Sequence, residues 1–290
     1  MTPATFLTSW RFDPVPFALT VAAATLYLVA ARRVWRTRGP SAFPRRRASF
    51  FFAGLGVLLV ALESPVHAYA GRLLSVHMAQ HLMITMVAAP LLVLGTPAML
   101  ALQASSRGVR RSVLLPVLHG PVGRVVGWPV LGWALFAAVM WATHVPPLYV
   151  AAVRSEAIHT LEHVAYLVAA LLFWLPVVGL DPSPRRLSHP ARLLYLFLSM
   201  PVTAVLGLAI YSASHVLYQP YVASTRSLGL SPLGDQHLAG ALMWEGGMLV
   251  MVVALGAVLF DWLAREEREA EREDARRVHD VARATGSTPG

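Results

Sequence analysis

Residues 77–97 read HMAQHLMITMVAAPLLVLGTP, and this stretch decides the fold. It is apolar enough to enter a bilayer, yet it begins with His77 and His81, four residues apart. On a helix this spacing stacks both imidazoles on one face, one turn apart. Polar side chains at the mouth of a membrane helix are costly unless they find partners, so the pair is a candidate functional site. His159 and His163 repeat the spacing in a second apolar segment.

The composition is typical of a polytopic membrane protein. Of the 290 residues, 56% are hydrophobic and 13% are charged, and the mean hydropathy is +0.57. The chain has no cysteine, which excludes disulfides, zinc–thiolate sites, iron–sulfur clusters and cysteine nucleophiles. All 24 basic residues are arginine, which excludes a lysine nucleophile, a Schiff base and a P-loop. The arginines that give the chain its net charge of +9 lie between apolar runs. This pattern indicates orientation in a bilayer and not nucleic-acid binding.

Seven apolar runs predict an all-α, polytopic bundle of seven transmembrane helices, since each is near the ~20 residues needed to cross the hydrocarbon core. The runs are 16–31, 50–63, 77–102, 128–144, 157–178, 193–212 and 237–262. Pro90 predicts a kink in the third run. We expect residues 1–263 to form the membrane domain and residues 264–290 a charged cytoplasmic tail, partly helical or disordered, because opposite charges repeat there at helical spacing.

The distribution of arginine predicts the orientation of the bundle. The loops between runs 1–2, 3–4 and 5–6 and the tail carry 7, 4, 3 and 6 arginines, whereas the opposite side carries only Arg11, Arg72, Arg154 and Arg226. Cytoplasmic segments of membrane proteins are enriched in basic residues. We therefore expect the N-terminus outside and the C-terminus in the cytoplasm, as an odd number of spans requires.

This orientation places eight of the eleven histidines at the outer face. Six lie within about two turns of a helix mouth, roughly 11 Å, so they are predicted to share one layer if the helices bundle around a common axis. The predicted metal ligands are His77, His81, His144, His159, His163 and His237. Imidazole binds copper, zinc and iron, and thioether sulfur binds cuprous copper. The sequence therefore predicts a metal or haem site near the outer surface.

Further side chains accompany this layer. Met78 and Asp235 are candidate secondary ligands, and three other methionines, Met83, Met140 and Met243, lie close by. Glu162, Glu63 and Asp235 are placed to orient imidazoles or to balance charge. Simpler interpretations exist for the same residues: methionine packs irregular cores, and single histidines at helix mouths form interfacial hydrogen bonds.

We find no recognised catalytic motif in the sequence. Neither histidine pair has the glutamate that follows the first histidine in the metalloprotease HExxH motif. Serine–histidine–aspartate triads, glycine-rich phosphate loops and paired catalytic carboxylates do not occur in a convincing arrangement. We expect the protein not to be an enzyme.

Three segments carry a family resemblance: the stretch at 77–97, THVPPLYVAAVRSEAIHTLEHVAYLVAALLFWLPV at 143–177, and DQHLAGALMWEGG at 235–247. They resemble the CtaG-type cytochrome c oxidase assembly factors, a family of polytopic bacterial membrane proteins, over roughly residues 50–260. The matching positions are His77, His81, Pro90, Gly95, Pro97, His144, Pro146, Pro147, Tyr149, His159, His163, Trp174, Asp235, Gln236 and Trp244. His237 and the charged tail fall outside the pattern.

The resemblance implies a multi-pass protein of the bacterial plasma membrane that helps to build an aa-type oxidase at its copper centres. Its partners would be membrane lipid and cytochrome c oxidase subunits, without nucleic acid. The expected function is copper binding in the histidine layer and insertion of copper into the oxidase. Two alternatives stay open: a b-type haem protein with histidines from two helices as axial ligands, and a metal-free assembly scaffold.

Overall fold

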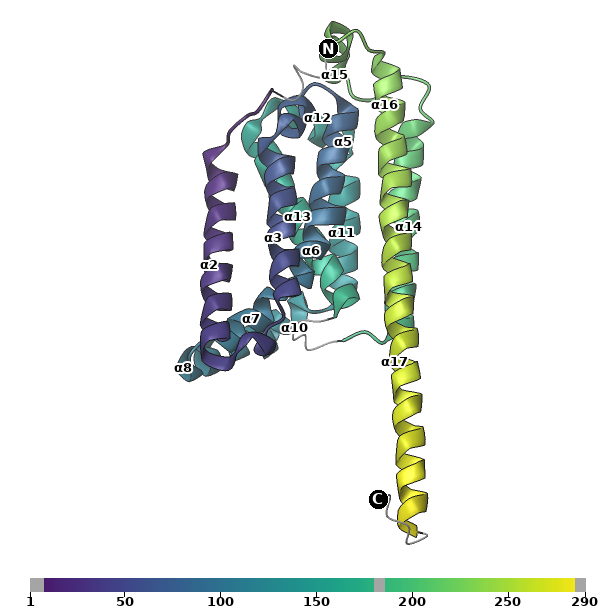
Figure 1. The fold of residues 1–290 in the computed structure, drawn as a ribbon. Helices are drawn as coiled ribbons and strands as arrows, with labels where there is room; N and C mark the ends of the chain where they lie inside the picture. Colours follow the sequence, from purple (N-terminus) through teal and green to yellow (C-terminus); the bar gives the residue numbers. More distant parts are fainter. Residues whose placement is uncertain (1–7, 180–185, 285–290) are drawn as a thin grey trace.

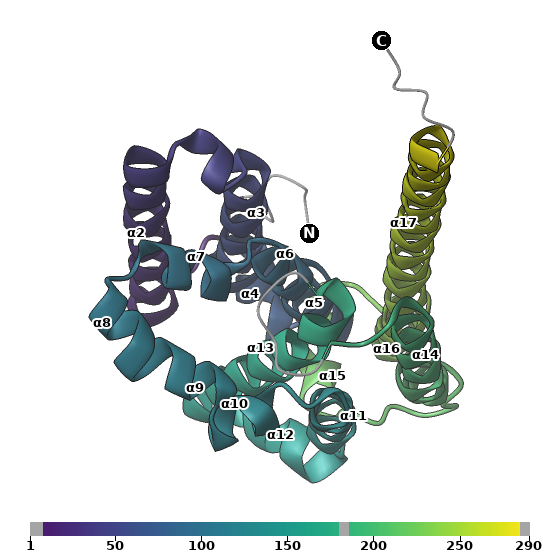
Figure 2. The ribbon, with the colours of Figure 1, turned by 90° about the horizontal axis from the view of Figure 1, so that it is seen from below.

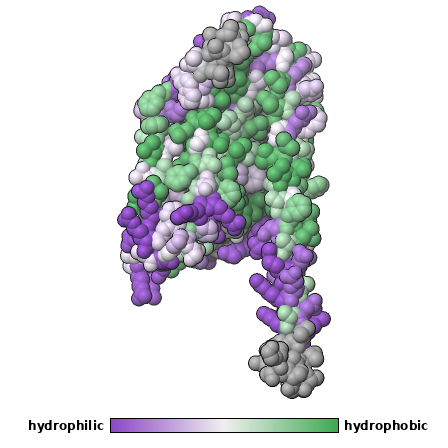
Figure 3. All heavy atoms as spheres, in the orientation of Figure 1, coloured by the Kyte–Doolittle hydropathy of each residue, from purple (hydrophilic) through white to green (hydrophobic). Residues whose placement is uncertain are grey.

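The computed structural model describes residues 8–179 and 186–284, with side chains as far as residue 277. Every regular element within these ranges is helical, which confirms the all-α prediction. The longer helices stand side by side as a bundle; α2 (Pro14–Arg38) begins at its upper end, and α17 (Gly247–Ala284) extends below its lower end (Figure 1). Hydrophobic side chains cover the middle of the bundle, and hydrophilic ones gather toward its lower end (Figure 3).

The remaining elements follow in the order of the chain. In chain order they are η1 (Pro40–Ala42), α3 (Arg45–Glu63), α4 (Pro65–Ala70), α5 (Leu74–Leu82), η2 (Met83–Ala88), α6 (Ala89–Leu94), α7 (Pro97–Ala104), α8 (Arg107–Val109), η3 (Arg110–Leu114), α9 (Leu115–His119), α10 (Pro121–Val126), α11 (Pro129–Thr143), α12 (Pro146–Arg154), α13 (Glu156–Val178), α14 (His189–Tyr211), α15 (Tyr221–Ser227), α16 (Pro232–Ala241) and η4 (Leu242–Gly246).

Local sequence explains where the long helices begin and end. Asp13, Ser155 and Ser231 accept hydrogen bonds from the first turns of α2, α13 and α16, as helix-capping side chains do. Gly39 and Gly179 follow the last residues of α2 and α13 with φ of +82° and +60°. Glycine adopts this left-handed conformation without the penalty of a side chain, so both helices end there.

Five helical stretches are long and apolar enough to cross a membrane, so the chain is a multi-pass membrane protein. They are Pro14–Arg38, Leu74–Ala104, Glu156–Val178, His189–Tyr211 and Pro232–Arg277. A sixth candidate is the pair α11 and α12, which is bent by 77° where the two helices meet. The expected run at 50–63 lies in α3, whose first turn holds three arginines and whose last residue is Glu63. The count of seven spans thus stays a prediction.

The third run is continuous but irregular. From Leu74 the chain passes through α5, the π-helical turn η2, α6 and α7. The irregular turn directly precedes Pro90, where the ring removes a backbone donor and crowds the preceding turn. Two further π turns occur among the described residues: η3 lies in the short helices after α8, and η4 joins α16 to α17. Such turns are rare in proteins and often occur at functional sites.

The arginine-rich loop after the third run differs from the sequence expectation. We expected a loop, whereas α8, η3, α9 and α10 form short helices that run along one edge of the bundle seen from below (Figure 2). Two exposed valines, Val113 and Val117, follow Arg110 and Arg111 there. This mixture of apolar and cationic side chains suits helices that lie in a membrane interface.

The bundle has two groups of helices: α14, α16 and α17 lie on one side, and α2 and α3 lie on the other (Figure 2). Glycines allow the first group to pack closely. A Cβ atom at Gly240 of α16 would lie 2.5 Å from the Tyr211 nitrogen and 2.7 Å from the Gly207 oxygen of α14. Small residues at helix contacts in membranes allow such close approach of two backbones.

Substitution of Gly240 therefore tests this contact. We expect Gly240→Ala to lower the free energy of unfolding by about 1–3 kcal/mol, because backbone atoms cannot move aside as a flexible side chain can. The measurement is thermal unfolding of the purified protein in detergent.

The matched control is Gly256→Ala in α17, where a Cβ atom meets nothing within 4 Å. Alanine favours a helix over glycine by about 1 kcal/mol, so the control should be neutral or stabilising. Equal effects of the two substitutions would contradict the proposed contact.

Candidate metal centre

The histidine pairs of α5 and α13 face each other. His77 and His81 on α5 and His159 and Glu162 on α13 each offer one ligand atom, and these atoms all lie within 4.8 Å of one another. The helical spacing accounts for this: residues three or four apart share one face of a helix. We call these four residues the His/Glu cluster. It lies in the upper half of the bundle, opposite the charged end of α17 (Figure 1).

The donor atoms of the cluster are buried and unpaired. His77, His81 and Glu162 are 1%, 5% and 6% exposed. Five atoms lack a hydrogen-bond partner among the described residues: His77 Nε2, both ring nitrogens of His81, His159 Nε2 and Glu162 Oε2. Leaving a buried polar group unpaired costs about 1–3 kcal/mol. A cation bound between these atoms would satisfy several of them at once, so the donor set fits a metal ion.

Tyrosines orient the His77 ring. The Tyr221 hydroxyl lies 3.1 Å from His77 Nδ1 and donates to the Ala70 carbonyl, also 3.1 Å away. Burial raises the pKa of Tyr221, so the phenol keeps its single proton. A proton on His77 Nδ1 would then donate to the phenol oxygen. In neutral imidazole this leaves the Nε2 lone pair facing the cluster, as a metal ligand requires.

Asp235 caps the helix that carries the first histidine pair. Its carboxylate accepts hydrogen bonds from Leu74 N at 2.7 Å and Ser75 N at 3.3 Å, and also from the Ser75 hydroxyl. These groups are the first donors of α5, so Asp235 fixes the start of the helix three residues before His77. The sequence analysis named Asp235 as a secondary ligand; in the structure its contacts are those of a positioning residue.

Two histidines border the cluster. The His163 ring lies 4.2 Å from the His159 ring and 5.8 Å from the His81 ring, and its Nε2 has no hydrogen-bond partner among the described residues. The His67 ring stacks 6.1 Å from that of His159, and its Nδ1 lies 3.2 Å from Gln80 Nε2. Burial and the nearby guanidinium of Arg11 lower the pKa of His67, which keeps its imidazole neutral.

The other predicted ligands lie elsewhere. His144 contacts the Met140 carbonyl through Nδ1 at 2.7 Å and Met78 Sδ through Nε2 at 3.4 Å. His237 Nε2 bonds to the Ala213 carbonyl at 3.1 Å, beyond the end of α14. The structure therefore brings together three of the six predicted histidines, with His163 adjacent, and adds Glu162. In the sequence HTLEH at 159–163, Glu162 lies one turn after His159, so the spacing predicts that both side chains share one face of the helix.

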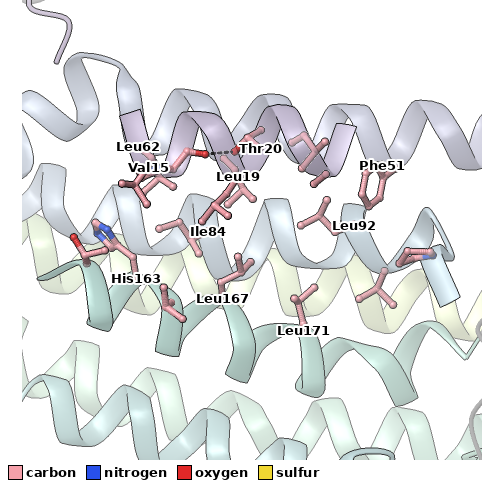
Figure 4. A pocket seen from close by; sticks show the side chains of 18 of the residues that line it. Val15, Leu19, Thr20, Phe51, Leu62, Ile84, Leu92, His163, Leu167 and Leu171 are labelled. Atoms are coloured by element: carbon pink, nitrogen blue, oxygen red, sulfur yellow. Dashed lines mark hydrogen bonds between the residues drawn. The ribbon is translucent and has the colours of Figure 1, made fainter. Parts of the chain in front are cut away.

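An apolar cavity of about 580 Å³ opens beside the cluster, between α2, α3, α6 and α13. Figure 4 shows His163 at one end and Leu167 and Leu171 following along α13. His67 also lines the cavity. Its size is that of a typical cofactor or ligand pocket.

Comparisons with known proteins agree with the membrane architecture. The family model described as cytochrome c oxidase caa3 assembly factor (Caa3_CtaG) matches residues 25–265. The chain is 33% identical over 288 residues to Uncharacterized protein Mb0105 of Mycobacterium bovis and to Uncharacterized protein MT0111 of Mycobacterium tuberculosis. It is 30% identical over 276 residues to Uncharacterized protein ML1998 of Mycobacterium leprae.

These matches cover 97%, 97% and 93% of this chain but 43%, 43% and 42% of the relatives, so the chain spans less than half of their length. No solved structure is significantly similar to the chain.

The cap formed by Asp235 gives a prediction. We expect Asp235→Ala to lower the free energy of unfolding by about 1–3 kcal/mol, because it leaves backbone donors of α5 unpaired. Metal affinity should fall with it, since α5 carries two of the four cluster residues. Thermal unfolding and metal titration of the purified protein measure both effects.

Asp235→Asn keeps an oxygen acceptor at the cap, so it should retain more stability than alanine. The control is Asp274→Ala on the exposed part of α17, which should change neither property. A stability of Asp235→Ala equal to that of this control would show that the cap does not hold α5.

Proposed function

The chain belongs to the cytochrome c oxidase caa3 assembly factor family, and from this we propose that it binds copper at the His/Glu cluster and delivers it to an oxidase during assembly. The observation that supports copper handling is the set of buried, unpaired donor atoms within 4.8 Å of one another. A cation bound there would give several of these atoms a partner at once.

The donors also bear on the kind of ion. Imidazole nitrogen and carboxylate oxygen suit cupric copper, zinc and ferrous iron, and affinity among divalent ions rises to its maximum at copper. We favour copper over zinc and iron because assembly of the oxidase requires copper to be inserted. Copper is here a cargo that leaves again, so the protein acts as an assembly factor and not as an enzyme.

The sidedness of the membrane supports delivery at the outer surface. We propose seven spans, with α3 as the second, an outer N-terminus and a cytoplasmic C-terminus, because arginines concentrate in the segments expected to be cytoplasmic. The His/Glu cluster then lies near the outer face. Partner subunits of the oxidase would receive copper there, and lipid would surround the apolar belt of the bundle.

A second candidate function is haem binding. The apolar cavity of about 580 Å³ has both His67 and His163 on its walls, from α4 and α13. Imidazole ligands in an apolar pocket are the usual surroundings of a b-type haem. A haem in this cavity would give the purified protein a Soret band.

The test of the proposed function is metal content and an optical spectrum of the protein purified from copper-replete cells. We expect copper without a Soret band, and we expect copper to fall to background in His77→Ala/His81→Ala and Glu162→Gln, because each removes donors from the cluster. Oxidase activity and oxidase copper content in cells carrying these variants should fall in parallel.

The control is His119→Ala, which changes an exposed histidine at the end of α9 and should leave copper content unchanged. A Soret band would move the assignment to the haem protein. Normal oxidase copper in the His77→Ala/His81→Ala cells, with the variant protein at its usual level, would leave only a metal-free scaffold.

A further inference from the structure

A second, much smaller cavity lies next to His81. Its volume is about 20 Å³, room for one water molecule or one ion. The residues that line it are Met78, His81, Leu82, Thr85, Met86, Met140, His144, Tyr166, Thr203 and Met243. We call this space the methionine cavity.

Four thioethers converge on the methionine cavity from four different elements. Met78 lies on α5, Met86 on η2, Met140 on α11 and Met243 on η4. All four side chains are buried, with 2% to 6% exposed. Methionine usually fills irregular gaps in a core, but here the side chains surround a gap and leave it open. Met83, which the sequence analysis placed with this group, does not line the cavity, whereas Met86 of the same π turn does.

The helix geometry sets the cavity apart from ordinary packing. Two π-helical turns, η2 and η4, supply Met86 and Met243. A π turn has poorer backbone geometry than an α-helical turn, and it is often found where a site requires a side chain in a particular place. Both π turns therefore contribute a methionine to the methionine cavity.

The lack of acidic side chains in the lining of the methionine cavity favours a monovalent over a divalent cation. The methionine cavity has no acidic residue among its lining side chains, whereas the His/Glu cluster contains Glu162. Burying a cation without a counter-charge costs less for a single charge than for two. Thioether sulfur and imidazole nitrogen are ligands of cuprous copper. His144 adds such an imidazole, with Nε2 3.4 Å from Met78 Sδ.

We propose that the methionine cavity is a separate binding site for a soft monovalent cation, cuprous copper, held by thioethers of Met78, Met140 and Met243 with His144. This inference rests on the proposed function only for the source of the ion; the site itself follows from its lining. His81 belongs to both sites, because it lines the methionine cavity and has two unpaired ring nitrogens. The two sites thus adjoin through one side chain.

The test uses two redox-inert probes with the purified full-length chain. Silver(I) reports the methionine cavity, because it shares the preference of cuprous copper for sulfur, and zinc(II) reports the His/Glu cluster. We expect Met78→Leu/Met243→Leu to weaken silver binding by about 10- to 100-fold and to leave zinc binding unchanged. His159→Ala should weaken zinc binding and leave silver binding unchanged.

Leucine for methionine conserves volume, so the variant should fold. The matched control is Met251→Leu, a fully buried methionine of α17 that does not line the cavity. X-ray absorption of the copper(I)-loaded protein should show sulfur neighbours that are lost in Met78→Leu/Met243→Leu.

Unchanged silver binding in Met78→Leu/Met243→Leu would overturn the inference, and so would an equal loss in Met251→Leu. Methionine-dependent silver binding without any zinc binding would support the methionine cavity while counting against the His/Glu cluster of the proposed function. The two ideas therefore fail separately.

Discussion

The meeting of polar side chains from α5 and α13 is the feature on which the site depends, and it brings polar atoms into an apolar bundle. A buried polar group in such a bundle is costly unless it has a hydrogen-bond partner or a bound ion. Tyr221 and Asp235 do this for one edge of the site: the first bonds to His77, and the second caps α5. The inner atoms, including Glu162 Oε2 and His81 Nε2, have no such partner among the described residues. The unpaired atoms face one another, and that arrangement fits a cation better than a hydrogen-bond network.

The π turns η2 and η4 also bear on the need to pair polar groups inside the membrane. A membrane span is most stable as an uninterrupted α-helix, because every backbone group then finds its partner within the helix. The third and last candidate spans instead contain η2 and η4, and both turns border the methionine cavity next to His81. Pro90 accounts for an irregularity near η2, but no proline lies in η4. Pro90 therefore offers an explanation for η2 only, whereas the proposed ion site would account for both η2 and η4.

The sequence predicted the helical class and the membrane environment, and it named the three histidines that the structure brings together, His77, His81 and His159. The i,i+4 spacing put each histidine pair on one face of its helix, and the apolar runs located five spans. The rotation of α11 and α16 about their own axes could not be read from local sequence, since it depends on packing between helices. The sequence therefore could not predict that His144 contacts Met78, or that His237 bonds to a carbonyl beyond the end of α14. Glu162 was assigned an orienting role, because spacing alone does not separate a ligand from its supporting group.

Adjacent sites with different ligand chemistry have a consequence for copper transfer. Thioethers and imidazoles both bind copper, so a cuprous ion could pass between the two proposed sites without a change of oxidation state. An ion moving between two such sites must exchange ligands one at a time, or it would face the full cost of a bare charge in an apolar interior. His81 is the residue that lines the methionine cavity and also belongs to the His/Glu cluster. In the proposed transfer its ring would hold the ion while the other ligands change, as a site that delivers its ion requires.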